Sequence, residues 1–185
     1  MGGEGRKPQL ALYRVTVSAE GKAGEPEELK PGVPLTGDQI AQAAARAIAA
    51  RQKFEFMCTP QFNAVVLPRG SGDKRSWVVY MLPGTTDASS IPFGGAYRVE
   101  TDWKGSRVLS KRAFSKSCLQ MPVRSDLESL VVTHLLDPHP TEIHVFLSLL
   151  AHKRIFVGTA ENEFLWAVQD GKILFVERIE DDAKK

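Results

Sequence analysis

Long apolar runs, a strong charge of either sign and clusters of cysteine are all missing from this chain of 185 residues. No run of 18 apolar residues occurs, so the sequence predicts no membrane-spanning helix. Lysine and arginine number 24 against 22 aspartates and glutamates, and this balance does not by itself indicate a polyanionic partner. The motifs CxxC and HExxH are absent, which removes the simplest redox and zinc-protease sites. What remains has the composition of a soluble globular protein, with 43% hydrophobic residues.

The two cysteines, Cys58 and Cys118, leave two interpretations open. They are either buried free thiols, because cysteine is among the most buried residue types, or one disulfide formed in an oxidising compartment. The first residues lack the apolar core of a signal peptide, so we expect a cytoplasmic location. The alternative is a periplasmic or secreted protein from which a signal peptide has been removed.

The pattern of apolar and turn residues predicts one α+β domain over residues 9–180, with a mainly antiparallel, curved sheet packed by two main helices. Within it, residues 19–34 are expected to form an exposed loop or arm, and residues 83–95 a long loop. The segments RIFVGT, FLWAVQ and KILFVERI predict a three-stranded meander near the C-terminus. Residues 1–8 are expected to be disordered and residues 181–185 to be a solvated tail.

Two segments carry helix signals. The first helix is expected over about residues 36–52, where Thr36 and Gln39 form a capping box before an alanine-rich stretch. The second is expected over about residues 140–152, where Pro140 suits the first turn. Helical spacing predicts two buried stripes, one of Ile40, Ala44, Ala47 and Ile48 and the other of Ile143, Phe146, Leu147 and Leu150.

The segment THLLDPHPTEIH, residues 133–144, contains three of the four histidines of the chain. Helical geometry turns Glu142 about 160° away from His144 and places His152 about 12 Å further along the axis, so neither can share an ion with it. The remaining candidate is a zinc site formed by His134, His144 and Asp137. In the alternative interpretation, these residues only shape the junction between a strand and a helix.

The segment VVTHLLDPHPTEIHVFLSLL, followed by RIFVGT, resembles the active-site unit of JAB/MPN metalloprotease-like domains. In that family a strand runs into His-x-His-Pro, and Ser-x-x-Asp opens the next helix. His134 matches the first histidine and Thr141 matches the serine. The resemblance implies the fold of this family.

Three positions depart from the family motif. Leu136 replaces the second histidine, Asp137 stands in place of the proline, and His144 replaces the aspartate. Glu55 is only a nominal candidate for the general base. Because one of the three standard ligands is kept, the resemblance implies that the ordinary activity of the family is lost.

A basic segment spans residues 103–116, and no acidic residue occurs between positions 103 and 125. Its candidate binding residues are Trp103, Lys104, Arg107, Lys111, Arg112 and Lys116. A basic hairpin that also carries aromatic side chains, here Trp103 and Phe114, can bind single-stranded nucleic acid. The same surface would suit an acidic protein partner, and the alternative is a solvated strand face.

No complete catalytic set can be assembled from the sequence, so we expect a protein–protein interaction domain without catalysis or cofactor. An immunity or accessory protein and a degenerate enzyme scaffold are examples of this class. The first alternative is a zinc-dependent hydrolase of the JAB/MPN type. The second is binding of single-stranded nucleic acid through residues 103–116. The expected partner is another protein, with an acidic protein the best match, rather than a membrane or a nucleic acid.

Overall fold

The computed structural model describes residues 9–84, 87 and 89–179, and the expectations for residues 1–8 and 181–185 lie outside this part of the chain. The described residues form a mainly antiparallel α+β fold with two α-helices, which confirms the fold class predicted from the sequence. Within the same residues, no helix is both long and apolar enough to cross a membrane.

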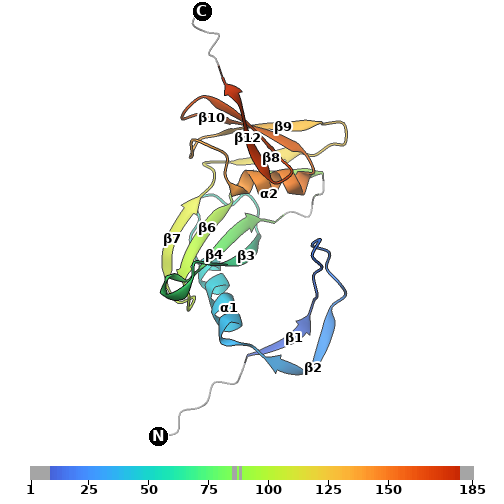
Figure 1. Ribbon diagram of the computed structural model, residues 1–185, viewed down its shortest axis with the longest axis vertical. Helices are drawn as coiled ribbons and strands as arrows, with labels where there is room; N and C mark the ends of the chain where they lie inside the picture. Colours follow the sequence, from blue (N-terminus) through green and yellow to red (C-terminus); the bar gives the residue numbers. More distant parts are fainter. Residues whose placement is uncertain (1–8, 85–86, 88, 180–185) are drawn as a thin grey trace, which may run out of the picture.

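The first layer pair consists of helix α1 (Gly37–Ala50) packed on an antiparallel sheet of four strands in the order β3-β4-β6-β7 (Figure 1). The strands are β3 (Phe62–Arg69), β4 (Ser76–Pro83), β6 (Tyr97–Asp102) and β7 (Val108–Ala113), with a short 3-10 helix, Gly72–Lys74, before β4. The capping box of Thr36 and Gln39 is confirmed. Fully buried Ala45 and Ala49 let α1 lie close to the sheet.

The second sheet has the order β12-β11-β10-β9. Its elements are β9 (Ser129–His134), helix α2 (Glu142–Ala151), β10 (Arg154–Thr159), β11 (Phe164–Gln169) and β12 (Lys172–Arg178). Strands β9 and β10 are parallel, with α2 as the connection between them, and β10, β11 and β12 are antiparallel neighbours. Asp170 and Gly171 both have positive φ in the tight turn before β12, as hairpin turns of two residues require.

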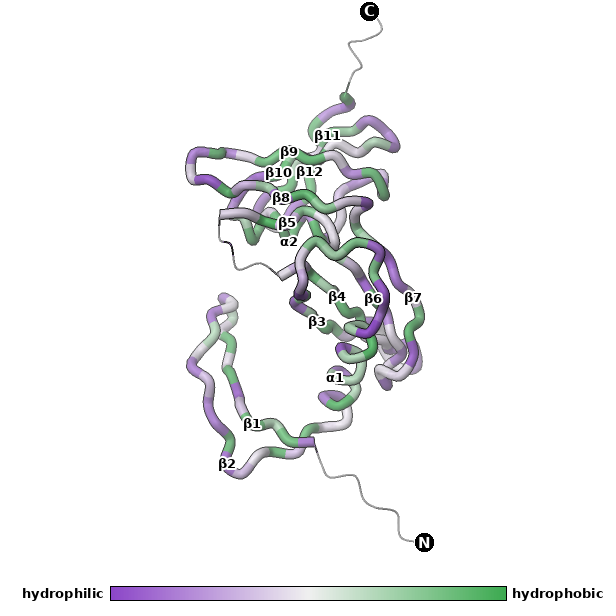
Figure 2. Tube along the Cα trace, turned by 180° about the vertical axis from the view of Figure 1, so that it is seen from behind, coloured by the Kyte–Doolittle hydropathy of each residue, from purple (hydrophilic) through white to green (hydrophobic). Residues whose placement is uncertain are grey.

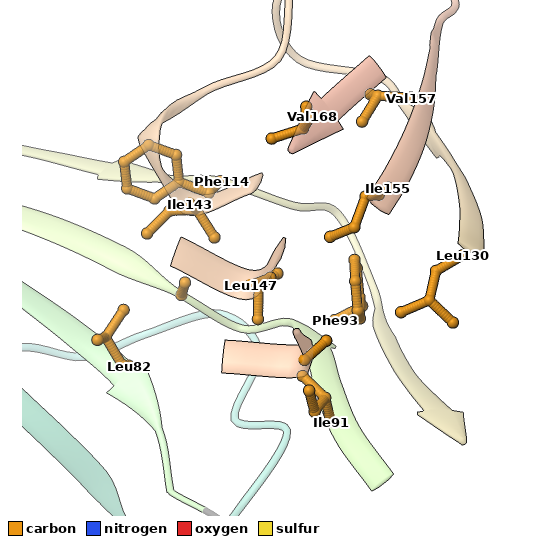
Figure 3. Close-up of a cluster of buried hydrophobic side chains, with 12 residues drawn as sticks. Leu82, Ile91, Phe93, Phe114, Leu130, Ile143, Leu147, Ile155, Val157 and Val168 are labelled. Carbon is orange, nitrogen blue, oxygen red and sulfur yellow. The ribbon is translucent and has the colours of Figure 1, made fainter. Parts of the chain in front are cut away.

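Helix α2 lies against β10 and β11 of the second sheet and against β5, and its inner side joins a core cluster that also includes residues from the first sheet region (Figure 3). Its Ile143 and Leu147 belong to one buried cluster with Leu82 and Phe114 of the first sheet region and Ile155 of the second. Strands β5 (Ser90–Gly94) and β8 (Cys118–Pro122) form a separate two-stranded sheet that adds Ile91 and Phe93 to this core.

Strands β1 (Leu10–Arg14) and β2 (Glu27–Pro34) pair with each other as an arm, which Figures 1 and 2 both show standing apart from the rest of the molecule. Six of its apolar side chains are 45–64% exposed, namely Leu10, Leu12, Tyr13, Val15, Val17 and Val33. Figure 2 shows apolar stretches in green on the arm, alternating with polar stretches in purple.

Three details of the fold differ from the sequence-based expectation. Residues 27–34, expected to be part of an exposed loop or arm, form strand β2 of an exposed arm, and β5 lies in the stretch expected to be a long loop. The described strands form two four-stranded and two two-stranded sheets instead of one curved sheet. The physical reason is the position of α2, which fills the core between the sheets and keeps them apart.

A disulfide joins Cys58, in the connection from α1 to β3, to Cys118 at the start of β8. It therefore links the half of the molecule built around α1 to the small sheet beside α2. Among the residues that the structure describes, no cysteine is free.

Candidate functional site

The three residues proposed as zinc ligands do lie together, at the junction between β9 and α2. The ring centroids of His134 and His144 are 4.7 Å apart, with their planes at 81°. The Nε2 atom of His134 lies 2.8 Å from Oδ2 of Asp137. Since a carboxylate can only accept, Nε2 carries the proton and donates this hydrogen bond.

Arg112, from the neighbouring strand β7, completes the cluster. Its guanidinium donates to the same Oδ2 of Asp137 over 2.7 Å, and it also lies 4.5 Å from the ring of Phe114. Burial alone raises the pKa of Asp137, but the hydrogen bonds and charges of Arg112 and His134 more than offset it, so this pKa lies below its ordinary value. The sequence gives no signal for this contact, because Arg112 and Asp137 are 25 residues apart.

His144 is 7% exposed, and its Nδ1 accepts the backbone N–H of Thr141 over 3.0 Å. The Thr141 hydroxyl lies 3.1 Å from the same nitrogen. Burial, followed by the charge of His134, lowers the pKa of His144 to about 4, so at neutral pH the ring is uncharged with its proton on Nε2. The predicted buried stripe of α2 does not include His144, which is buried because α2 is covered on more than one side.

This arrangement does not fit a zinc ion. Oδ2 of Asp137 already accepts from Arg112 and His134, and the positive guanidinium stands beside it. Nδ1 of His144 is occupied as an acceptor. Within the described parts of the chain, no group of three or more His, Cys, Asp or Glu side chains could hold a metal ion. Glu55, the nominal general base, is exposed in the connection between α1 and β3.

A cavity of about 110 Å³ lies beside His134 and His144 and is otherwise lined mainly by small and apolar side chains. Its size suits a few water molecules, whereas sites for small-molecule substrates commonly have about 300 Å³ or more. The cavity beside His134 and His144 is therefore smaller than the sites that commonly hold a small-molecule substrate.

The other two histidines of this region are not part of the cluster. His139 is exposed, and its Nδ1 lies 3.1 Å from the carbonyl oxygen of Pro140. His152 is exposed at the C-terminal end of α2, where it adopts a left-handed conformation with φ of 51°. This position agrees with the prediction that His152 lies too far along the helix to share a metal ion with His144.

The cluster acts as a polar connection between three elements. Arg112 belongs to β7 of the first sheet, His134 ends β9 of the second, and His144 opens α2. Their hydrogen bonds meet at Asp137 or at the first turn of the helix. What this geometry does best is fix the two sheets and the helix relative to one another.

The aromatic side chains of the basic segment are covered. Trp103 stacks on Trp77 with ring centroids 4.3 Å apart, and the guanidinium of Arg75 lies 4.3 Å from the Trp103 ring. Phe114 is only 4% exposed. Neither Trp103 nor Phe114 thus offers a free face to a nucleic-acid base.

The charged side chains of the basic segment divide into two groups. Lys111 donates to the carbonyl of Lys53 over 2.6 Å, and Arg112 binds Asp137. Lys104, Arg107 and Lys116 are exposed. A smaller basic surface than expected is therefore available to a partner.

The resemblance to JAB/MPN domains rests on His134, Thr141 and the order of strand, loop and helix. The structure shows that order as β9, the loop that carries Asp137, and α2. The resemblance stays a prediction, because comparison of the chain with protein-family models, curated proteins and solved structures finds no match.

Proposed function

We propose that this chain is a protein-binding domain without catalysis of its own, and that the β1–β2 arm is its binding element. The observation that carries the proposal is the apolar surface of the arm, where Tyr13 and Val17 are 64% and 59% exposed. An exposed apolar patch on a protein exterior is typical of an interaction site, and we assign the exposed apolar side chains of the arm to such a patch.

The structure of the arm supports the same proposal. A two-stranded hairpin is marginally stable in water unless further strands or a helix cover one of its faces. The arm contains two internal ion pairs, Arg14 with Glu27 and Lys30 with Glu28, but all four side chains are exposed and such pairs contribute little. A partner that covers the apolar side chains would supply the missing stabilisation.

The test is site-specific photo-crosslinking with the full chain in an extract of its source cells. A photoreactive amino acid at Tyr13 should give covalent adducts of discrete mass, and the same residue at Glu161, in an exposed turn of the second sheet, should not. Mass spectrometry of the adducts identifies the partner. Equal yields at the two positions, or no adduct at Tyr13, would contradict the proposal.

The exposed lysine and arginine side chains provide a second contact surface in the proposal. Lys104, Arg107 and Lys116 would favour an acidic partner, although the Asp102 carboxylate beside Arg107 already offsets part of this positive charge. Binding through this surface would weaken with added salt, whereas binding through the apolar arm would not.

The disulfide between Cys58 and Cys118 supports a location in an oxidising compartment. We therefore favour the periplasm or the cell exterior over the cytoplasm. Trapping of free thiols in intact source cells tests this directly. Two labelled thiols per chain would overturn the assignment.

Zinc-dependent hydrolysis remains the first alternative. It would require Asp137 to break its ion pair with Arg112. His144 would also have to break its hydrogen bond with the backbone N–H of Thr141, since a catalytic zinc needs three protein ligands. Elemental analysis of the purified chain, together with melting in the presence of a chelator, tests it. Stoichiometric zinc and a melting temperature lowered by chelation would support the hydrolase.

Binding of single-stranded nucleic acid is the second alternative. Without free aromatic faces it would rest on phosphate contacts from the exposed basic side chains alone. A titration with labelled single strands at low salt decides it. A steep loss of affinity with increasing salt would support this function, and absence of binding would remove it.

A further inference from the structure

The molecule carries an apolar groove between helix α2 and edge strand β3. Two adjoining hollows of about 340 and 240 Å³ share Val65 of β3 and Phe146 of α2, together with Leu82 and Ile143 in the floor. Their outer walls are unusually exposed for apolar residues, with Leu67 47% and Leu150 49% exposed. We call this feature the α2–β3 groove.

The α2–β3 groove can accept a strand as well as apolar side chains. Strand β3 pairs with β4 on one side, and its other edge has no neighbour among the described strands. An unpaired edge presents backbone N–H and C=O groups that another strand can bind. Both views place β3 on the side of the body that faces the arm (Figures 1 and 2).

The arm cannot easily fold into the groove of its own chain. Its ladder continues up to the hydrogen bond from Leu35 N–H to the carbonyl of Gln9, and the capping box of Thr36 starts α1 at the next residue. No flexible linker lies between these two units. Because Ala45 and Ala49 fix α1 on the sheet, the arm is held away from the body and toward another molecule.

The area available favours two contacts over one. Strand β2 has 8 residues, about 26 Å of extended chain, and a two-stranded ribbon is roughly 10 Å wide. One arm in one groove would then bury roughly 500 Å² over both surfaces, below the roughly 1,000 Å² of a specific interface. Two reciprocal contacts reach that size. A second copy supplies both an arm and a groove.

We propose that two copies of this chain form a two-fold dimer in which the arm of each lies in the α2–β3 groove of the other. The proposal rests on the proposed function, since it names the protein that the arm binds. Leu12 of one copy contacts Val65 and Leu67 of its partner copy, and the arm adds to the edge of β3. The contact is isologous, so the assembly closes at two subunits.

The experiment is sedimentation and light scattering of the full purified chain over a range of concentrations. We expect a dimer of twice 20.4 kDa. Leu12→Glu in the arm and Leu67→Lys in the groove should each weaken dimerisation roughly tenfold or more. Leu174→Glu on β12 is the control, since Leu174 is 55% exposed, like Leu12 at 56%, but lies in the other sheet.

Mixing the two interface variants separates contact from misfolding. The mixed dimer has one native arm in a native groove and one contact in which Glu meets Lys, so mixing L12E with L67K should restore association. Weakening by L174E as strong as by L12E, or no recovery on mixing, would overturn the dimer.

The crosslink at Tyr13 distinguishes failure of the dimer proposal from failure of the proposed binding function. An adduct at the mass of two chains supports the dimer, and an adduct to a different protein, with the purified chain monomeric, overturns the dimer but leaves the binding function standing. A crosslink within one chain would show that the arm closes on its own body, and this also overturns the dimer.

Discussion

At the scale of single residues, the polar cluster depends on the protonation of each side chain. Arg112 keeps Asp137 charged, and the backbone N–H of Thr141 needs a lone pair on Nδ1 of His144. Protonation of His144 would remove that lone pair inside a buried site. The cluster is therefore stable only with His144 neutral.

This gives a prediction for acid sensitivity. The pKa of His144 is about 4 in the folded protein against an ordinary value of 6.5, so between these limits the unfolded state binds more protons. The stabilisation is complete above pH 6.5 and is lost as the pH falls through this window. Between pH 7.5 and 5.0 we expect a loss on the order of 2 kcal/mol from this residue. Urea unfolding at both pH values measures it.

The variant His144→Gln is the matched control for the acid sensitivity. Glutamine can accept the Thr141 N–H, as Gln39 does for Thr36 in α1, and it does not titrate. The variant should lose clearly less stability than the native chain between pH 7.5 and 5.0. An identical loss in both proteins would show that another group is responsible.

At the scale of elements, both helices were predicted, but their buried faces were only partly right. In α1 the fully buried residues are Ala45 and Ala49, whereas Ile40 is 41% exposed. Hydrophobic periodicity predicts that the largest apolar side chains of a helix are buried. Where the helix backbone lies close to another backbone, however, only the smallest side chains fit between them. The backbone of α1 approaches the turn at Gly105 so closely that only small residues fit between them.

The buried face of helix α2 was also only partly predicted, but for a different reason. Ile143 and Leu147 are buried as predicted, but Phe146 and Leu150 are exposed and Ser148 is buried. Ser148 donates to backbone carbonyls, which satisfies its hydroxyl in the core. A one-sided stripe assumes a single sheet beside the helix, and the second sheet could not be foreseen from periodicity.

The contact between α1 and the β6–β7 turn leads to the second prediction. A Cβ at Gly105 would lie 2.4 Å from the backbone nitrogen of Ala45, and φ there is +66°. Gly105→Ala should therefore lower the free energy of unfolding by roughly 1–2 kcal/mol, because alanine is strained in a left-handed conformation. Overpacking against α1 should lower it by roughly a further 1–3 kcal/mol. Thermal and urea unfolding measure this loss.

Gly171→Ala provides the control for backbone strain alone. Gly171 has a φ of +75°, but a Cβ there would have no atom within 4 Å. This variant should show only the conformational cost. If the two variants lose equal stability, α1 does not lie as close to the turn as described.

At the scale of the whole molecule, the disulfide links parts that the secondary structure leaves separate. Cys58 follows α1, and Cys118 lies in the small sheet that packs beside α2. The sequence left this pairing open, because two cysteines 60 residues apart give no information on distance in space. Only the fold brings them together.

The third prediction concerns removal of this disulfide. In the chain-entropy model, closing a loop of 60 residues stabilises the folded state by about 4 kcal/mol. The double variant Cys58→Ser/Cys118→Ser should therefore unfold at a clearly lower urea concentration than the native chain. Reductant should lower the midpoint of the native chain to a similar value and leave that of the variant unchanged. A native midpoint insensitive to reductant would contradict the prediction.

The parallel pairing of β9 with β10 has a consequence for the order of folding. Strands β11 and β12 meet across a two-residue turn and can pair as soon as both exist. Parallel strands cannot pair through a tight turn, so β9 has to wait until residues 135–153, including α2, have folded back. Pairing across such a distance in the chain is slow. The polar cluster at the end of β9 therefore assembles late, and the hairpin of β11 and β12 is the earlier scaffold on which it forms.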